Sequence, residues 1–203
     1  MSIITFSENH EAQLIPFEDG QSLASLRDGG NEGLQWVYSL GLIPTQSAVV
    51  VGLGAGFHIA ALADLDPNLN ITVVESREAL IPVFRARFSH LRDRVNIVIV
   101  KEASEIFSTD AFQEAKDNRS YILTFRECWG QQVQLFMGVF SHLTGRSLES
   151  ARYHLEEYGI NMKALYLQPG QLVSIKELMP VVESSPLLEY RKQVFRVVNE
   201  LVK

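Results

Sequence analysis

The sequence contains a single cysteine, Cys128, among 203 residues, so no intramolecular disulfide can form. There is no cysteine cluster and the five histidines are scattered, a distribution that indicates no zinc site. There is also no run of about eighteen apolar residues, the length that a membrane span requires. The first residues have neither a basic region nor a long apolar core, and we therefore expect no signal peptide and a cytoplasmic location.

The chain also lacks an excess of positive charge. Its net charge is −6 at pH 7, whereas proteins that bind nucleic acid or anionic membranes in general are usually basic. We therefore expect neither of these as a partner. With 46% hydrophobic and 21% charged residues, the composition is typical of a globular domain, and the length allows one large domain or one domain with extensions.

The most informative stretch is a glycine-rich turn between residues 48 and 58. A β-branched run leads into Gly52, Gly54 and Gly56, and a helical pattern follows at once. Such a turn carries a buried parallel strand into a helix above a bound ligand, with the glycines allowing a tight bend and close backbone approach. The dinucleotide fingerprint G-x-G-x-x-G fails at Phe57, and no P-loop ending is present. Taken alone, the turn is equally compatible with a purely structural corner.

Two acids follow the next strands in an order that favours a ligand site. Residues 70–75 form a predicted buried strand ending in Glu75, about twenty residues after the glycines, where an acid commonly accepts hydrogen bonds from ribose hydroxyls. A third predicted strand, residues 95–100, is followed closely by Glu102 and Ala103. Either acid alone could be a solvated strand end, but the three features in sequence favour an adenosine-type site.

Residues 47 to about 126 resemble the cofactor-binding half of class I S-adenosylmethionine (SAM) methyltransferases, with the spermidine-synthase-like branch close in character. The resemblance implies that the glycines approach the methionine part of SAM, that Glu75 binds the ribose, and that Glu102 with the Ala103 N–H binds the adenine. The cofactor-binding residues expected on this basis are Gly52, Leu53, Gly54, Gly56, Phe57, His58, Glu75, Ser76, Glu102 and Ala103.

Two departures from the methyltransferase pattern put the chemistry in doubt. Members of that family often carry an acid two residues before the first glycine, where this chain has Val50. The predicted fourth strand, residues 121–125, is followed by Arg126 and Glu127 and lacks the Asn/Asp-Pro-Pro motif of many catalytic members. No catalytic residue is therefore assigned.

A second resemblance covers the N-terminal half. The run from Asn31 through Trp36 to the Gly-x-Gly-x-Gly-aromatic-His motif ending at His58, with Glu75 beyond it, resembles the amino-terminal Rossmann-like region of motility-associated-factor proteins. These are related to 6-hydroxymethylpterin diphosphokinase-like proteins, in which a separate catalytic region follows. The present chain is too short to hold both regions, so the resemblance implies no diphosphokinase activity.

The alternating strand and helix patterns predict a three-layer, Rossmann-like α/β fold of the SAM-methyltransferase type on a mostly parallel sheet, with a helical C-terminal third. We expect residues 1–46 to form a hairpin and helix cover, 47–126 the ligand-binding core, and 127–203 a mainly helical extension. Within these parts, the expected elements are a hairpin at 2–6 and 12–17, a helix capped by Asn31, a helix at 77–90, one or two short helices at 103–116, a helix capped by Ser147, a fifth strand at 163–167, and helices at 172–179 and 185–202.

Two functions remain open from the sequence. The first is a SAM-dependent methyltransferase-like protein acting on an unknown small molecule, with no bound metal. The second is a non-catalytic module that binds a nucleotide or nucleotide-sugar and works with a partner protein. The sequence leaves open whether the chain forms a homo-oligomer.

Overall fold

The computed structural model describes residues 2–41, 47–116, 120–147, 150, 174–185 and 187–201. The chain divides into two compact units, Met1–Arg146 and Ser147–Lys203, which are described separately below. The predicted strand at 163–167 and the helix expected after Ser147 lie outside the described residues.

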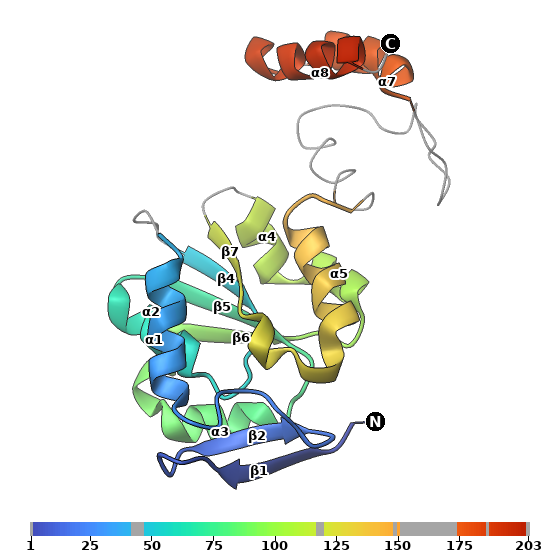
Figure 1. Cartoon of the computed structure of the whole chain (residues 1–203). Coiled ribbons are helices and arrows are strands. Elements are labelled where there is room, and N and C mark those ends of the chain that lie inside the picture. The colour runs from blue at the N-terminus through green and yellow to red at the C-terminus, as the bar shows by residue number, and fades with distance from the viewer. Residues whose placement is uncertain are drawn as a thin grey trace. The chain divides into compact units, whose positions relative to one another are not determined.

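A four-stranded parallel sheet forms the centre of the first unit (Figure 1). Its strands are β4 (Ser47–Val51), β5 (Asn70–Glu75), β6 (Val95–Ile99) and β7 (Ser120–Thr124), in the spatial order β6-β5-β4-β7. The chain builds outward from β4 through β5 to β6 and then returns to place β7 on the other side of β4. In open α/β sheets of this kind, ligands bind outside the carboxyl ends of the strands where the order reverses, which here is between β4 and β7.

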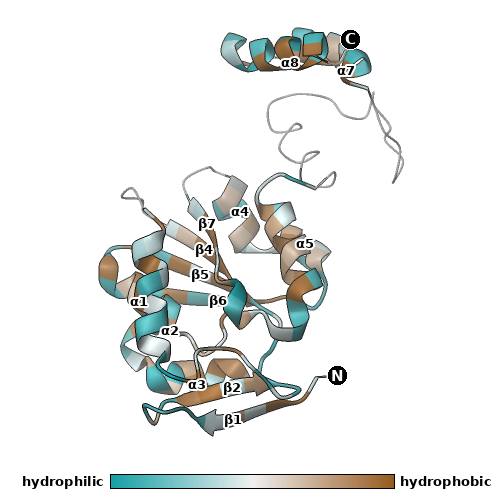
Figure 2. Cartoon of the chain, in the orientation of Figure 1, coloured by the Kyte–Doolittle hydropathy of each residue, from teal (hydrophilic) through white to brown (hydrophobic). Residues whose placement is uncertain are grey.

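Helices cover both faces of the sheet and give the predicted three-layer α/β fold. The side chains of β4 alternate, so that Ala48 and Val50 enter one hydrophobic cluster while Val49 and Val51 enter another. The first cluster is closed by α1 (Gly29–Ser39), α2 (Phe57–Leu65), α3 (Leu80–Arg87) and η1 (Ser89–Leu91). The second is closed by η2 (Ala103–Ser108), α4 (Asp110–Lys116) and α5 (Val133–Leu143). Figure 2 shows the apolar strands between these two helical layers.

The predicted N-terminal hairpin is confirmed. Strands β1 (Ile4–Glu8) and β2 (Leu14–Glu18) pair antiparallel, and a short strand, β3 (Gln21–Ser22), extends the sheet. The prediction that Asn31 caps the following helix is wrong, because α1 begins two residues earlier. Its N-cap is Asp28, whose extended backbone lets its carboxylate accept a hydrogen bond from the Asn31 N–H at 3.1 Å.

The second unit contains α7 (Ile175–Ser184) and α8 (Glu189–Leu201), which confirm the helical patterns predicted for this part of the chain. The start of α7 is fixed by a capping box between Ser174 and Glu177. Arg196 of α8 forms ion pairs with Glu183 and Glu189.

Candidate functional site

The glycine turn is built as its sequence requires. It connects β4 to α2, and Gly54 and Gly56 have φ angles of +49° and +81°, in the left-handed region that side chains strain. A Cβ atom at Gly54 would lie 2.7 Å from the Leu23 carbonyl oxygen and would collide with Cys128. The turn is therefore enclosed by neighbouring parts of the same chain.

Two side chains from the segment after β7 occupy the space beside the turn. Cys128 ends η3 (Arg126–Cys128), and Trp129 links it to η4 (Gly130–Gln132). Both are buried, and the Trp129 indole N–H donates a hydrogen bond of 2.8 Å to the Val51 carbonyl at the end of β4. A methionine moiety bound beside the glycines would require this segment to move.

The Glu75 carboxylate at the end of β5 lies against the glycine turn. Its Oε2 accepts a hydrogen bond of 2.8 Å from the Leu53 N–H, and its Oε1 accepts one of 2.7 Å from the Ser76 N–H. The side chain is fully buried. The acid and the glycines therefore meet, as expected for parallel strands whose carboxyl ends share one edge of the sheet.

Arg77 occupies the remaining acceptor positions of this carboxylate. Its Nε lies 2.7 Å from Glu75 Oε1 and its Nη2 lies 2.9 Å from Oε2, a bidentate arrangement. Its Nη2 also donates to the Cys128 carbonyl at 3.0 Å, and its Nη1 lies 3.2 Å from Glu18 of β2. Burial opposes ionisation of the guanidinium, but the two carboxylates outweigh that effect and raise the pKa of Arg77.

Glu18 ties the N-terminal hairpin to this network. Its Oε1 accepts a hydrogen bond of 2.7 Å from the Gln132 side chain, and its Oε2 accepts one of 2.9 Å from the Gln131 N–H. Burial by itself would raise the pKa of Glu18, but these hydrogen bonds, one from Ser2 and the charge of Arg77 together lower it. The result is a buried Glu18–Arg77–Glu75 triad that joins four segments of the chain.

An open pocket of about 430 Å³ lies next to this triad, at the carboxyl ends of β5 and β6. Lys101, which follows β6, forms an ion pair of 2.9 Å with Glu78 and donates 2.7 Å to the Ser76 carbonyl. Both members of the ion pair are more than half exposed, so either can turn toward a ligand. The pocket is lined by Ser2, Ile4, Ser76, Arg77, Glu78, Ala79, Lys101, Gln132 and Leu135.

Glu102 and Ala103 follow β6 as predicted, but neither lines this pocket. Glu102 is exposed and precedes η2 without capping it through its side chain. The acid that contacts the backbone here is Glu105, whose side chain accepts a hydrogen bond of 2.6 Å from the Lys101 N–H. The place expected to bind adenine is therefore next to the pocket rather than within it.

Phe57 and His58 lie on the other side of the turn. The buried His58 ring packs against Trp36 and Phe125, with ring centroids 5.3 and 4.5 Å away, and its Nε2 lies 3.1 Å from the Gly52 carbonyl oxygen. Burial lowers the pKa of His58 to about 4, although the hydrogen bond to Gly52 acts in the opposite direction, so the ring is neutral at pH 7. Phe57 contacts Arg87, which lies 4.7 Å from its ring centroid.

Arg77, Glu18 and Lys101 were not among the predicted site residues. The sequence offers a weak signal for Arg77, since a basic residue two positions after the strand-ending acid can fold back onto it. Glu18 lies 57 residues before Glu75 in the sequence. No local sequence pattern predicts its contact with Arg77.

Within the part of the chain that the structure describes, no group of three or more side chains is arranged to hold a metal ion. No described helix combines the length and the apolarity needed to cross a membrane.

Comparisons with known proteins found matches among solved structures only. No family model matches the chain, and no curated protein matches it. Among solved structures, spermidine synthase from Thermotoga maritima is similar, with 18% sequence identity and a TM-score of 0.43. The match covers 52% of this chain and 40% of that one, so less than half of the synthase has a counterpart here.

Proposed function

We propose that this chain is a non-catalytic binding module for a nucleotide or nucleotide-sugar, which enters the pocket at the carboxyl ends of β5 and β6. The observation that carries the proposal is the position of this 430 Å³ pocket beside a strand-ending acid that touches a glycine turn. Its volume falls within the range of small-molecule sites, about 300–1,000 Å³. Lys101 and Arg77 would face the anionic part of the ligand.

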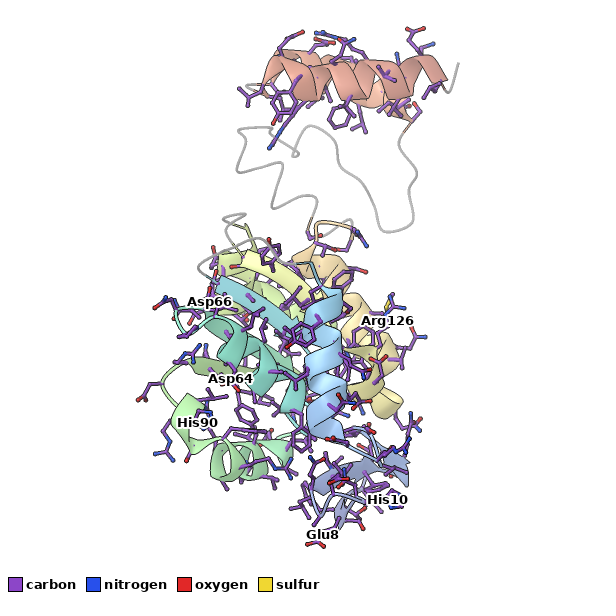
Figure 3. The ribbon with its side chains drawn as sticks, turned by 60° about the vertical axis from the view of Figure 1, so that its left-hand side comes forward. Glu8, His10, Asp64, Asp66, His90 and Arg126 are labelled. Atoms are coloured by element: carbon purple, nitrogen blue, oxygen red, sulfur yellow. The ribbon has the colours of Figure 1, made fainter. Side chains whose placement is uncertain are left out.

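The segment after β7 supports binding without catalysis. This edge of the sheet is where a methyl acceptor would approach, but Phe125, Cys128 and Trp129 are buried there. Burial raises the pKa of the Cys128 thiol well above its usual value, so it is not a nucleophile at neutral pH. Arg126, labelled in Figure 3, and Glu127 are exposed. The Arg126 guanidinium carbon lies 5.7 Å from the Trp129 ring centroid.

SAM binding with methyl transfer is a second candidate function. The hydrogen bond between the Leu53 N–H and Glu75 favours it, because the methyltransferase resemblance expects the ribose-binding acid beside the glycines. On this alternative, the segment that carries Cys128 and Trp129 would move aside to admit the methionine part.

We further propose that the module acts with a partner protein. Apolar side chains along α8 are exposed, among them Tyr190 at 62%, Val194 at 59% and Leu201 at 79%. An apolar stripe on a helix is normally covered by other apolar groups, and an exposed one fits a surface that another protein covers.

Calorimetric titration with ADP, UDP-glucose and SAM tests the proposed ligand class. We expect ADP or the nucleotide-sugar to bind, and Lys101→Ala to weaken binding about three- to tenfold, the effect of about 1 kcal/mol that an exposed charge contributes. Lys176→Ala changes the same residue type at an exposed position of α7 and should leave the affinity unaltered. Absence of binding by every ligand at millimolar concentration would refute the proposal, and transfer of a methyl group from SAM would favour the second candidate.

A further inference from the structure

We infer that Arg77 is a gate between the open pocket and the Glu75 carboxylate, and that Glu18 of the N-terminal hairpin holds this gate closed. The inference rests on the proposed function, because it concerns access to the same site. It adds the chemical class of ligand that opens the gate: a molecule that carries both vicinal hydroxyls and an anionic group.

Arg77 and a ribose would compete for the same two oxygens. The guanidinium contacts both oxygens of Glu75, at 2.7 and 2.9 Å, while backbone N–H groups from Leu53 and Ser76 take further acceptor positions. A carboxylate with this many donors has no room for two ribose hydroxyls. Ribose binding to Glu75 therefore requires the guanidinium to leave.

The pocket offers the guanidinium a place to go. Arg77 already lines it, and the side chain is attached to the loop between β5 and α3 that forms one wall. Rotation of the flexible side chain into the pocket would join this space to Glu75 without moving the sheet. Phe136, whose ring centroid lies 5.4 Å from the guanidinium carbon, forms an apolar boundary on the α5 side.

Glu18 opposes this rotation. Its carboxylate lies 3.2 Å from Arg77 Nη1 and accepts hydrogen bonds from Gln131 and Gln132. The last residue of β2 and the segment after β7 therefore both restrain the guanidinium. Figure 1 shows the hairpin at the edge of the sheet where β5 ends, and Figure 3 labels Glu8 and His10 at its outer end. A ligand that binds only the open state has its apparent affinity reduced by the fraction of open molecules.

The charge balance selects the ligand. When Arg77 turns into the open pocket, it leaves Glu18 and Glu75 buried without their cation, which is unfavourable, and it loses its own ion pairs. A phosphate beside Lys101 would give Arg77 a new partner in a bidentate geometry that guanidinium and phosphate share. The ribose of the same ligand would replace Arg77 on Glu75. A neutral nucleoside supplies only the hydroxyls, so it should bind much more weakly than the corresponding nucleotide.

Calorimetry with ADP and adenosine on the wild type and two variants of the whole 203-residue chain tests the gate. Glu18→Gln removes the charge that holds Arg77 and keeps the size of the side chain, whereas Glu11→Gln makes the same change at an exposed position of the same hairpin. We expect Glu18→Gln to bind ADP between about 5- and 150-fold more tightly than the wild type, the usual range for coupling between two groups. Glu11→Gln should match the wild type, and adenosine should bind each protein at least tenfold more weakly than ADP.

The outcomes separate the gate from the proposed function. Equal ADP affinity of the wild type and Glu18→Gln would overturn the gate and leave the binding module intact, and so would equal affinity for adenosine and ADP. No ADP binding by any of the three proteins would overturn both. If Glu18→Gln does not fold, Glu18→Asp, which lengthens the contact to Arg77, should tighten ADP binding in the same direction, and an unchanged affinity would again overturn the gate.

Discussion

Replacement of Arg77 by methionine should strongly destabilise the protein at neutral pH. Methionine fills much of the same space but leaves Glu18 and Glu75 buried without their cation. Removing one partner of a buried ion pair typically costs about 3–5 kcal/mol, because the remaining charge is desolvated and uncompensated. Since domains are stable by about 5–15 kcal/mol, we expect a folded but weakened variant. The assay is urea unfolding followed by circular dichroism at pH 7.

The pH dependence of this cost separates an electrostatic role of Arg77 from simple packing. In the wild type the pKa of Glu18 is lowered, so its contribution to stability is present above the unfolded pKa near 4.5 and is lost as the pH falls through the lower folded value. Without Arg77 the pKa of Glu18 rises, so the cost is full at neutral pH and is relieved when the carboxylate takes up a proton.

The difference in unfolding free energy between the two proteins should therefore shrink between pH 7 and pH 4. Arg27→Met, at an exposed position, serves as the control and should change stability by less than about 0.5 kcal/mol. A cost below about 1 kcal/mol for Arg77→Met at pH 7, or one that does not vary with pH, would refute the reasoning.

Two further predictions concern the glycine turn and its surroundings. Gly54→Ala should lower the free energy of unfolding in urea by about 2–5 kcal/mol, because the new Cβ adds a collision with Cys128 and Leu23 to the left-handed strain. Gly20→Ala has similar strain but open space around it, so it should lower the same free energy by about 1–2 kcal/mol. Equal losses for the two variants would contradict the close packing around Gly54. The folded pKa of His58 is about 4, below its unfolded value of 6.5, so its contribution to stability is full above pH 6.5 and falls at lower pH as the unfolded state takes up a proton. The free energy of unfolding of the wild type should fall by about 2 kcal/mol between pH 7 and pH 5 through this group, and His58→Asn should lack that fall. An identical pH profile for the two proteins would show that the ring is not buried and neutral.

The sheet could be predicted from sequence because each strand carries its own signal. The β-branched run at residues 70–75 is buried except at its first residue, whereas the run at 95–100 forms the edge strand β6 and is mostly half-buried. The observed bounds of both strands agree closely with the predicted ones. Helix ends are harder to predict: the helix predicted at 77–90 is divided into α3 and η1. The one or two short helices predicted at 103–116 are present as η2 and α4. Pro82 lies in the first turn of α3, where its missing N–H is tolerated.

The site was predicted only as far as local patterns reach. The contact between the glycine turn and Glu75 follows from strand order, since adjacent parallel strands bring their carboxyl ends together. The occupation of that contact by Arg77 depends on Glu18 and on the backbone carbonyl of Cys128, which come from remote parts of the chain. Such packing has no periodic signature in the sequence. The division at residues 46/47 and 126/127 stays a prediction.

The central claim is that a nucleotide binds in the pocket at the carboxyl ends of β5 and β6. Titration of isotope-labelled protein with ADP, followed by amide NMR, tests it most directly. We predict saturable shifts of the amide signals of Ser76, Arg77, Glu78 and Lys101, with smaller shifts at Leu53. Unchanged spectra at millimolar ADP, or shifts confined to residues far from this edge of the sheet, would contradict it.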